Sequence, residues 1–485
     1  MPTAYEAVIG LEVHAELETH SKMFCGCAVV DSTTADPNTV VCPICLGMPG
    51  VLPVINRRAV EFAIRVGLAL NCEIATVNVF ARKSYFYPDL PKGYQITQYE
   101  LPIAKNGYID IDLPDGTSKR VRIRRAHLEE DTGKSIHVGN SSLIDFNRSG
   151  VPLLEIVTEP DIRSDLEAEA YARKLRSILQ YLGVNSGDMS KGVLRMEPNI
   201  SVRPRGSNEL RTRTEIKNLN SIRSLQKGSA LEIERQIKLY ETGGTVNQAT
   251  LGYDETTNRL TIQREKESAS DYRYFPEPDL PALNISREWI EEIRKSLPEL
   301  PDAKRDRLVS LGIKPADAAV LVTARPVADY FEGVVASGAD PKKAASWIIN
   351  ELFARMNKAA LPAEDIGAIK VTPPALAALI GLVEKGTINN NAAKTVLDAL
   401  YAEGGHPAEW VAKLGLEQTQ DMGAVEAIIT RILEANAADV ARYCAGEEKV
   451  FRFLTGLVMK EGRGKFPAEA TQALLLEKIK ARCGG

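Results

Sequence analysis

The 485-residue sequence contains no apolar run that approaches the roughly 20 residues needed to cross a bilayer. Its first residues also lack the basic and then apolar pattern of a secretory signal peptide. Acidic and basic residues nearly balance, with a net charge of −4, so a nucleic acid would have to bind local basic patches. We therefore expect a cytoplasmic protein without membrane segments. The hydrophobic fraction of 44% and the charged fraction of 26% are ordinary for globular proteins, and the length predicts roughly two to four domains.

Cysteine is scarce, with seven residues, but four of the seven lie in one short segment. A C-x-C pair, Cys25 and Cys27, is followed after fourteen residues by a C-x-x-C pair, Cys42 and Cys45. In a cytosolic protein this spacing favours a tetrahedral zinc site over disulfides. Four thiolates would leave zinc no open position, so we expect a structural metal. The alternative is two unrelated cysteine pairs.

Apolar and ionisable residues alternate over 9–17, which predicts a half-buried strand. Glu12, His14 and Glu16 would share the face opposite the core. Two carboxylates that flank an imidazole on one strand could hold a divalent cation. The alternative is the polar side of an ordinary edge strand.

A second acidic cluster lies at 127–131 (HLEED), and Glu155 interrupts an apolar strand predicted over 153–157. An uncompensated carboxylate is expensive to bury, so Glu155 should meet a metal or an arginine. The sequence Gly133-Lys134-Ser135 resembles the end of a phosphate-binding loop. That motif requires glycine at position 128, where this chain has leucine, so a nucleotide must be held differently.

Basic residues are concentrated between 191 and 228, with nine basic against three acidic side chains. Their alternation is typical of strand faces and suits the phosphates of a nucleotide or of RNA. A solvated basic face is the alternative. The residues of this ladder are Arg203, Arg205, Arg211, Arg213 and Lys217.

The order of the predicted elements changes along the chain. A helix over 57–70 and a hairpin over 108–125 precede a helix that opens with a capping box at Ser164 and ends at Gly183. After about residue 293, alanine-rich helical patterns replace strand alternation. These later helices are predicted around 302–311, 315–337 and 341–358, with a break at 404–407.

Five long stretches resemble one family, that of GatB, the B component of aspartyl/glutamyl-tRNA(Asn/Gln) amidotransferase. The resemblance covers essentially the whole chain in matching order, and each motif is long and unusual. The stretches are 10–14 (GLEVH), 83–89 (KSYFYPD), 127–135 (HLEEDTGKS), 145–156 (DFNRSGVPLLEI) and 271–279 (DYRYFPEPD).

The resemblance implies an α+β fold in three parts. Residues 1–293 would form a cradle-shaped catalytic domain with an antiparallel sheet similar to those of glutamine synthetase and guanidino kinases, and a zinc-binding insert at about 25–45. Residues 294–405 would form an all-α domain. Residues 406–485 would form a small helical tail, similar to YqeY proteins, that binds tRNA with help from a basic loop at 460–465.

The resemblance also implies an ATP-dependent carbon–nitrogen ligase. ATP would phosphorylate the side-chain carboxylate of Glu on tRNA(Gln) or Asp on tRNA(Asn), and ammonia would then amidate it. The chain has neither a Cys-His glutaminase pattern nor a Ser-Ser-Lys amidase triad, so ammonia would come from glutamine hydrolysed by the GatA partner. A GatC partner would complete a heterotrimer, and a non-discriminating aminoacyl-tRNA synthetase is a further expected partner.

Carried over by motif, the resemblance assigns roles to individual residues. The expected cofactors are ATP, Mg²⁺ and a structural Zn²⁺. The Mg²⁺ ligands and catalytic residues would be Glu12, His14, Glu130 and Glu155, with Glu129 close by; the basic ladder would stabilise ATP phosphates; Lys83 and Lys92 would lie near the ammonia passage.

Two other functions fit the same residues. The chain could only dock tRNA for a catalytic partner, or it could be a self-sufficient kinase or ligase for a small carboxylate. A helical tail favours the two tRNA functions. The sequence leaves open whether Glu-tRNA(Gln), Asp-tRNA(Asn) or both are substrates.

Overall fold

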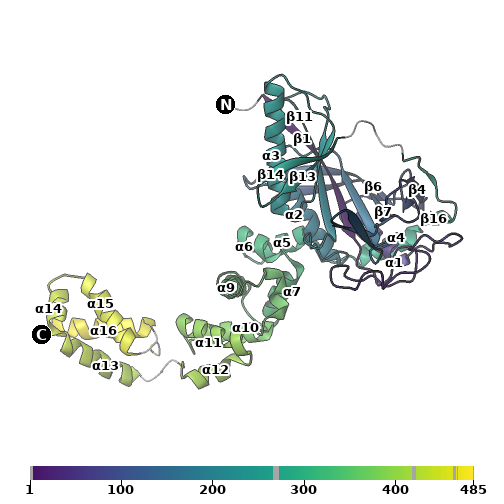
Figure 1. Cartoon of the computed structure of the whole chain (residues 1–485). Coiled ribbons are helices and arrows are strands. Elements are labelled where there is room, and N and C mark those ends of the chain that lie inside the picture. Colours follow the sequence, from purple (N-terminus) through teal and green to yellow (C-terminus); the bar gives the residue numbers. More distant parts are fainter. Residues whose placement is uncertain (1–3, 266–271, 418–421, 463–465, 467, 484–485) are drawn as a thin grey trace. The chain divides into compact units, whose positions relative to one another are not determined.

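The computed structural model describes residues 4–265, 272–417, 422–462, 466 and 468–483 (Figure 1). The expected motif residue Asp271 and the last three residues of the basic loop, 463–465, lie outside this description. The chain divides into two compact units, Met1–Pro301 and Asp302–Gly485. The first is mixed α/β with a large sheet, and the second is helical. No helix among the described residues is both long and apolar enough to cross a membrane.

A twelve-stranded, mostly antiparallel sheet forms the first unit. The predicted strand at 9–17 is β1, which lies between β10 and β11 near the middle of the sheet. The main path runs β14-β13-β12-β11-β1-β10-β7-β5-β4-β15, and β6 and β2 branch from β7. The strands are β1 Tyr5–Glu16, β2 Glu73–Ile74, β4 Ala81–Ser84, β5 Tyr94–Thr97, β6 Ala104–Asp112, β7 Ser118–Glu130, β10 Pro152–Thr158, β11 Leu194–Pro204, β12 Thr214–Lys217, β13 Ala249–Asp254, β14 Arg259–Glu265 and β15 Phe275–Pro276.

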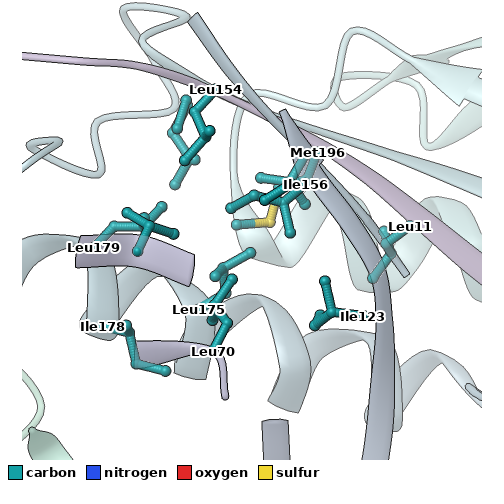
Figure 2. Packing of buried hydrophobic residues seen from close by; sticks show 14 of the residues in the cluster. Leu11, Leu70, Ile123, Leu154, Ile156, Leu175, Ile178, Leu179 and Met196 are labelled. Carbon is teal, nitrogen blue, oxygen red and sulfur yellow. The ribbon is translucent and has the colours of Figure 1, made fainter. Parts of the chain in front are cut away.

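One face of this sheet is covered by helices and carries the hydrophobic core. Alternation along β1 puts Leu11, Val13 and Ala15 into that core. Figure 2 shows strand residue Ile156 with Leu175 of a neighbouring helix in the same buried cluster. The opposite, polar face is therefore free to build a site. The helices of this unit are α1 Arg57–Ala69, α2 Asp165–Leu182, α3 Ile222–Glu241 and α4 Arg287–Lys295; two small ribbons pair β3 Val77–Asn78 with β16 Leu283–Asn284, and β8 Lys134–Val138 with β9 Ser141–Asp145.

The predicted start and stop of α2 are confirmed. The Ser164 hydroxyl accepts a hydrogen bond from the Glu167 backbone N–H, and Gly183 ends the helix in the left-handed conformation with φ of 63°. The hairpin of β6 and β7 and the helix α1 are also confirmed.

The basic ladder and two later helices differ from their predictions. Arg203 lies on β11, but Arg205, Arg211 and Arg213 lie in the connection to β12 and not on strands. A single alternation, with one residue between two arginines, is too short a pattern to distinguish a strand from an extended loop. The segment 315–337 is two helices, and 341–358 contains a π-helical turn, η1.

The second unit contains two separate hydrophobic cores. Val411 and Trp410, after the Gly404-Gly405 break, belong to the first of these. A disulfide joins Cys444 to Cys483, with 5.3 Å between their Cα atoms. The elements are α5 Pro301–Ser310, α6 Pro315–Leu321, α7 Arg325–Ala336, α8 Pro341–Ser346, η1 Trp347–Leu352, α9 Phe353–Lys358, the 3₁₀ turn η2 Ala363–Ala368, α10 Pro373–Glu384, α11 Asn390–Glu403, α12 Pro407–Leu414, α13 Met422–Ala435, α14 Ala437–Cys444, α15 Lys449–Glu461 and α16 Ala468–Cys483.

Candidate functional site

The polar face of the sheet brings ionisable residues from neighbouring strands into direct opposition. His14 on β1 lies opposite Glu155 on β10, and Glu155 lies opposite His127 on β7. On the other side of β1, Glu12 lies opposite Glu197 on β11. Residues directly opposite each other in an antiparallel pair have their β-carbons about 5 Å apart. The strand order therefore assembles a cluster from residues far apart in the sequence.

The first group of possible metal ligands consists of His14, Glu129 and Glu155, whose ligand atoms lie within 4.8 Å of one another. The His14 Nε2 is 3.5 Å from a Glu155 oxygen and 3.8 Å from a Glu129 oxygen. His127 Nε2 lies 3.4 Å from Glu155. Imidazole and carboxylate donors at these separations can bind a divalent cation.

Electrostatics in this group favours the charged forms of His14 and Glu155 and disfavours that of Glu129. Burial alone would lower the pKa of His14, but its hydrogen bond to Glu155 and the charges of Glu155 and Glu129 raise that pKa to about 9. Burial would raise the pKa of Glu155, but His127 and His14 hold it well below its usual range. Burial, followed by the charge of Glu155, raises the pKa of Glu129. The carboxylates thus already attract positive charge to this point of the sheet.

A second group consists of Glu12, Glu197 and Glu215, from β1, β11 and β12. Their oxygens also lie within 4.8 Å of one another. Burial and then the charge of Glu155 raise the pKa of Glu12. Asn199 donates a hydrogen bond to Glu12 at 3.2 Å, which orients that carboxylate.

The sequence pattern was not used to select Glu197 and Glu215 as site residues, although strand alternation indicates Glu197. Arg195, Glu197 and Asn199 occupy every second position of their strand, as the polar residues of β1 do.

Glu130 does not join either group. Its carboxylate forms an ion pair with Lys92 and accepts a hydrogen bond from the Ile96 backbone N–H at 3.1 Å. Successive residues of a strand point to opposite faces, so Glu129 takes the position beside His14 that the motif comparison assigned to Glu130. Glu12 likewise belongs to the second group, although Glu155 is near enough for its charge to raise the pKa of Glu12.

A cavity of about 850 Å³ opens over both carboxylate groups. Its wall includes Tyr272, whose ring lies 5.1 Å from the Lys83 ammonium. Carboxylates and cations face one space, as a site for a phosphate-bearing substrate and a metal requires. Of the residues selected from sequence, the cavity is lined by Glu12, His14, Glu129, Glu155, Lys83, Arg211, Arg213 and Lys217.

The remaining selected basic residues lie elsewhere. Arg203 pairs with Glu6 at 2.7 Å, and Arg205 follows the end of β11; neither lines the cavity. Lys92 is also outside it, paired with Glu130. Lys217 lines the cavity and donates to Glu197 at 2.9 Å.

The four clustered cysteines come together as their spacing predicts, and none of them forms a disulfide. All four sulfur atoms lie within 4.8 Å of one another, and those of Cys42 and Cys45 are 3.8 Å apart. Tetrahedral zinc with Zn–S bonds of about 2.3 Å separates its sulfurs by about 3.8 Å. The Cys42 N–H also donates to the Cys45 sulfur at 3.1 Å. The thiol donor set therefore fits zinc.

Comparison with known proteins identifies the family. Residues 7–291 match the family described as the GatB/GatE catalytic domain, and residues 329–479 match the GatB domain. The GatB component of the aspartyl/glutamyl-tRNA(Asn/Gln) amidotransferase of Geobacter sulfurreducens is 51% identical over 98% of this chain and 99% of its own length. Those of Carboxydothermus hydrogenoformans and Moorella thermoacetica are 49% and 50% identical, over 98% of this chain and 99% and 100% of their own lengths. The chain belongs to the GatB family of aspartyl/glutamyl-tRNA(Asn/Gln) amidotransferase components.

Proposed function

We propose that the chain is the ATP-dependent subunit that converts Glu on tRNA(Gln), Asp on tRNA(Asn), or both, into the corresponding amide. The observation that carries this proposal is the cavity in which two carboxylate groups face Lys83, Arg211 and Arg213. A site that only docked tRNA would have no need to hold partly buried carboxylates within 4.8 Å of one another.

The chemistry requires activation of an unreactive carboxylate. Its oxygen attacks the γ-phosphorus of ATP, ADP leaves, and an acyl phosphate remains on the aminoacyl-tRNA. Ammonia then attacks the acyl carbon, the bond from that carbon to the phosphate oxygen breaks, and the proton that nitrogen loses leaves with inorganic phosphate as HPO4²⁻. Both steps concentrate negative charge, so positioning and positive charge should provide most of the catalysis. Arg211 and Arg213 would supply part of that charge from the cavity wall.

Mg²⁺ fits the two carboxylate groups by donor chemistry. His14, Glu129 and Glu155 would hold one cation, and Glu12, Glu197 and Glu215 would hold another. Bound Mg²⁺ would neutralise phosphate oxygens. His127 and Asn199 would keep Glu155 and Glu12 oriented.

The proposal extends to partners and architecture. GatA would produce ammonia, GatC would complete a cytoplasmic heterotrimer, and a non-discriminating synthetase would deliver the mischarged tRNA. The Lys92–Glu130 pair, with Lys83 in the cavity wall, would mark the ammonia passage. We retain a cradle similar to glutamine synthetase and guanidino kinases for 1–293, a helical domain for 294–405 and a YqeY-like tRNA-binding tail for 406–485.

The cysteine cluster would hold one structural zinc. Its four thiol donors and the 3.8 Å separation between the Cys42 and Cys45 sulfurs support this assignment. No coordination position would remain for a substrate, so the metal would stabilise the segment and take no part in the reaction.

The test is reconstitution of the chain with its GatA and GatC partners and an amidation assay on both mischarged tRNAs. We expect amide formation that requires ATP and Mg²⁺, with ADP formed in step with the amide. A complex that binds mischarged tRNA but never consumes ATP would favour the docking function. ATP consumption with free glutamate or aspartate as the acceptor would favour the small-carboxylate ligase.

A further inference from the structure

Lys22 is fully buried, with 0% of its surface exposed. Its ammonium donates to the backbone carbonyls of Val40 and Phe146, at 3.0 and 3.2 Å. Among the residues that the structure describes, it forms no ion pair with a carboxylate. Lys92 and Lys304, which are also largely buried, pair with Glu130 and Glu332 respectively.

A buried ammonium without an opposite charge is unfavourable, because carbonyl hydrogen bonds do not replace the free energy of its hydration. Lys22 therefore needs a source of negative charge that the neutral thiol form of the chain does not supply.

The surroundings of Lys22 point to the cysteine cluster as that source. The Lys22 N–H donates to the Cys27 carbonyl at 2.9 Å, and its ammonium holds Val40, two residues before Cys42. The Lys22 Cδ and the Cys45 Cβ both lie 3.7 Å from the position that a β-carbon on Gly150 would occupy. Lys22 therefore hydrogen-bonds to the backbone of the first cysteine pair and to the backbone just before the second pair.

We propose that Lys22 is the counter-ion of the cysteine cluster, which requires the zinc assignment made above. Four thiolates and one Zn²⁺ carry a net charge of −2, and this charge would sit in a partly buried loop. A fixed cation beside it stabilises the metal-bound state, and the metal-bound cluster in turn compensates the buried ammonium. Lys22 is a positioning residue here, since it donates to carbonyls and does not bind the metal.

The first experiment compares Lys22→Met with the full-length wild-type chain in its complex. Methionine keeps the apolar stem and removes the charge. The zinc dissociation constant is measured by competition with a chelator of known affinity. We expect Lys22→Met to weaken zinc binding about 10- to 100-fold, as outer-shell substitutions do. Lys134→Met is the matched control, because Lys134 also donates to a carbonyl near this loop, that of Ser32. The control should retain wild-type affinity.

A second measurement separates charge compensation from simple packing. Lys22→Met should lower the melting temperature of the zinc-bound protein but have little effect after the zinc is chelated. Equal losses in both forms would overturn the proposal. A second variant, Cys27→His, gives a cluster with one negative charge fewer, and Lys22→Met should weaken zinc binding less in that background. If Lys22→Met folds in neither background, with or without zinc, its role is packing and the proposal is overturned.

The outcomes distinguish the two assignments. Wild-type protein without zinc would refute both the zinc site and the role of Lys22. Zinc in the wild-type protein together with an unchanged dissociation constant in Lys22→Met would refute the role of Lys22 alone.

Discussion

Glu129 and Glu130 are consecutive residues at the end of β7, but their carboxylates have different partners on opposite faces of the sheet. Glu129 lies 3.8 Å from His14, among the possible metal ligands. Glu130 forms an ion pair with Lys92. Strand alternation therefore assigns the two neighbouring acids to different tasks.

This difference predicts different effects for two matched substitutions. Glu129→Gln should abolish binding of one cation and lower the rate of amide formation by about 100-fold or more, because a lost ligand weakens charge stabilisation in the transition state. Glu130→Gln should keep cation binding. Titration with Mn²⁺ followed by electron paramagnetic resonance measures the binding, and tRNA affinity is the control for folding. Equal Mn²⁺ binding by the two variants would contradict the assignment.

Zinc content provides a second prediction. Purified protein should contain about one zinc per chain, and Cys42→Ser should lower both zinc content and melting temperature, because a structural site contributes folding free energy. Cys72→Ala is the control, since Cys72 is buried outside the cluster and should not affect zinc. Metal analysis that finds no zinc, with four freely titratable thiols, would refute the site.

The raised pKa of Glu16 predicts that the free energy of unfolding depends on pH. Burial, followed by the charge of Asp131, raises the pKa of Glu16 to about 8. Between its ordinary pKa, about 4.3, and pH 8, the folded protein retains a proton at Glu16 that the unfolded chain loses. The resulting stabilisation is fully present at low pH in this window and is lost as the pH rises through 8, by at most about 1.4 kcal/mol per pH unit.

Glu16→Gln should remove this contribution, because the amide resembles the protonated acid. Denaturant unfolding of both proteins at pH 6 and 8.5 measures it. Relative to that of the wild-type protein, the unfolding free energy of Glu16→Gln should be higher at pH 8.5 than at pH 6. Glu18→Gln, at an exposed position, is the control and should show no such change. A constant difference between wild type and Glu16→Gln would contradict the prediction.

The last helices should contribute to tRNA affinity and not to chemistry. Because Val411 packs into the preceding core, a truncated chain should end after Leu416 and not at the glycine break. The truncated chain should still assemble with GatA and GatC and support glutamine hydrolysis by GatA. Its affinity for mischarged tRNA should fall, and the salt dependence should decrease by about one unit of slope for each lost phosphate contact. Equal affinities for full-length and truncated complexes at two salt concentrations would refute tRNA binding by these helices.

Local signals in the sequence predicted local structure well. The alternation of β1 and the capping box of α2 depend on neighbouring residues, and both are confirmed. His127 and Glu129 have the same parity, so alternation could also have selected Glu129 instead of Glu130. By contrast, periodicity contains no information on which strands become neighbours. The opposition of Glu12 and Glu197 depends on the pairing of β1 with β11, which the sequence pattern alone does not specify.

Transfer of oxygen from the side-chain carboxylate to phosphate shows whether the cavity activates that carboxylate by phosphorylation. Glu-tRNA(Gln), or Asp-tRNA(Asn), carrying ¹⁸O in the side-chain carboxylate is incubated with the reconstituted complex, ATP, Mg²⁺ and glutamine. We predict one ¹⁸O atom in inorganic phosphate for each amide formed, and loss of both products in Glu129→Gln. Amide formation without ¹⁸O in the phosphate would show that the carboxylate is not phosphorylated.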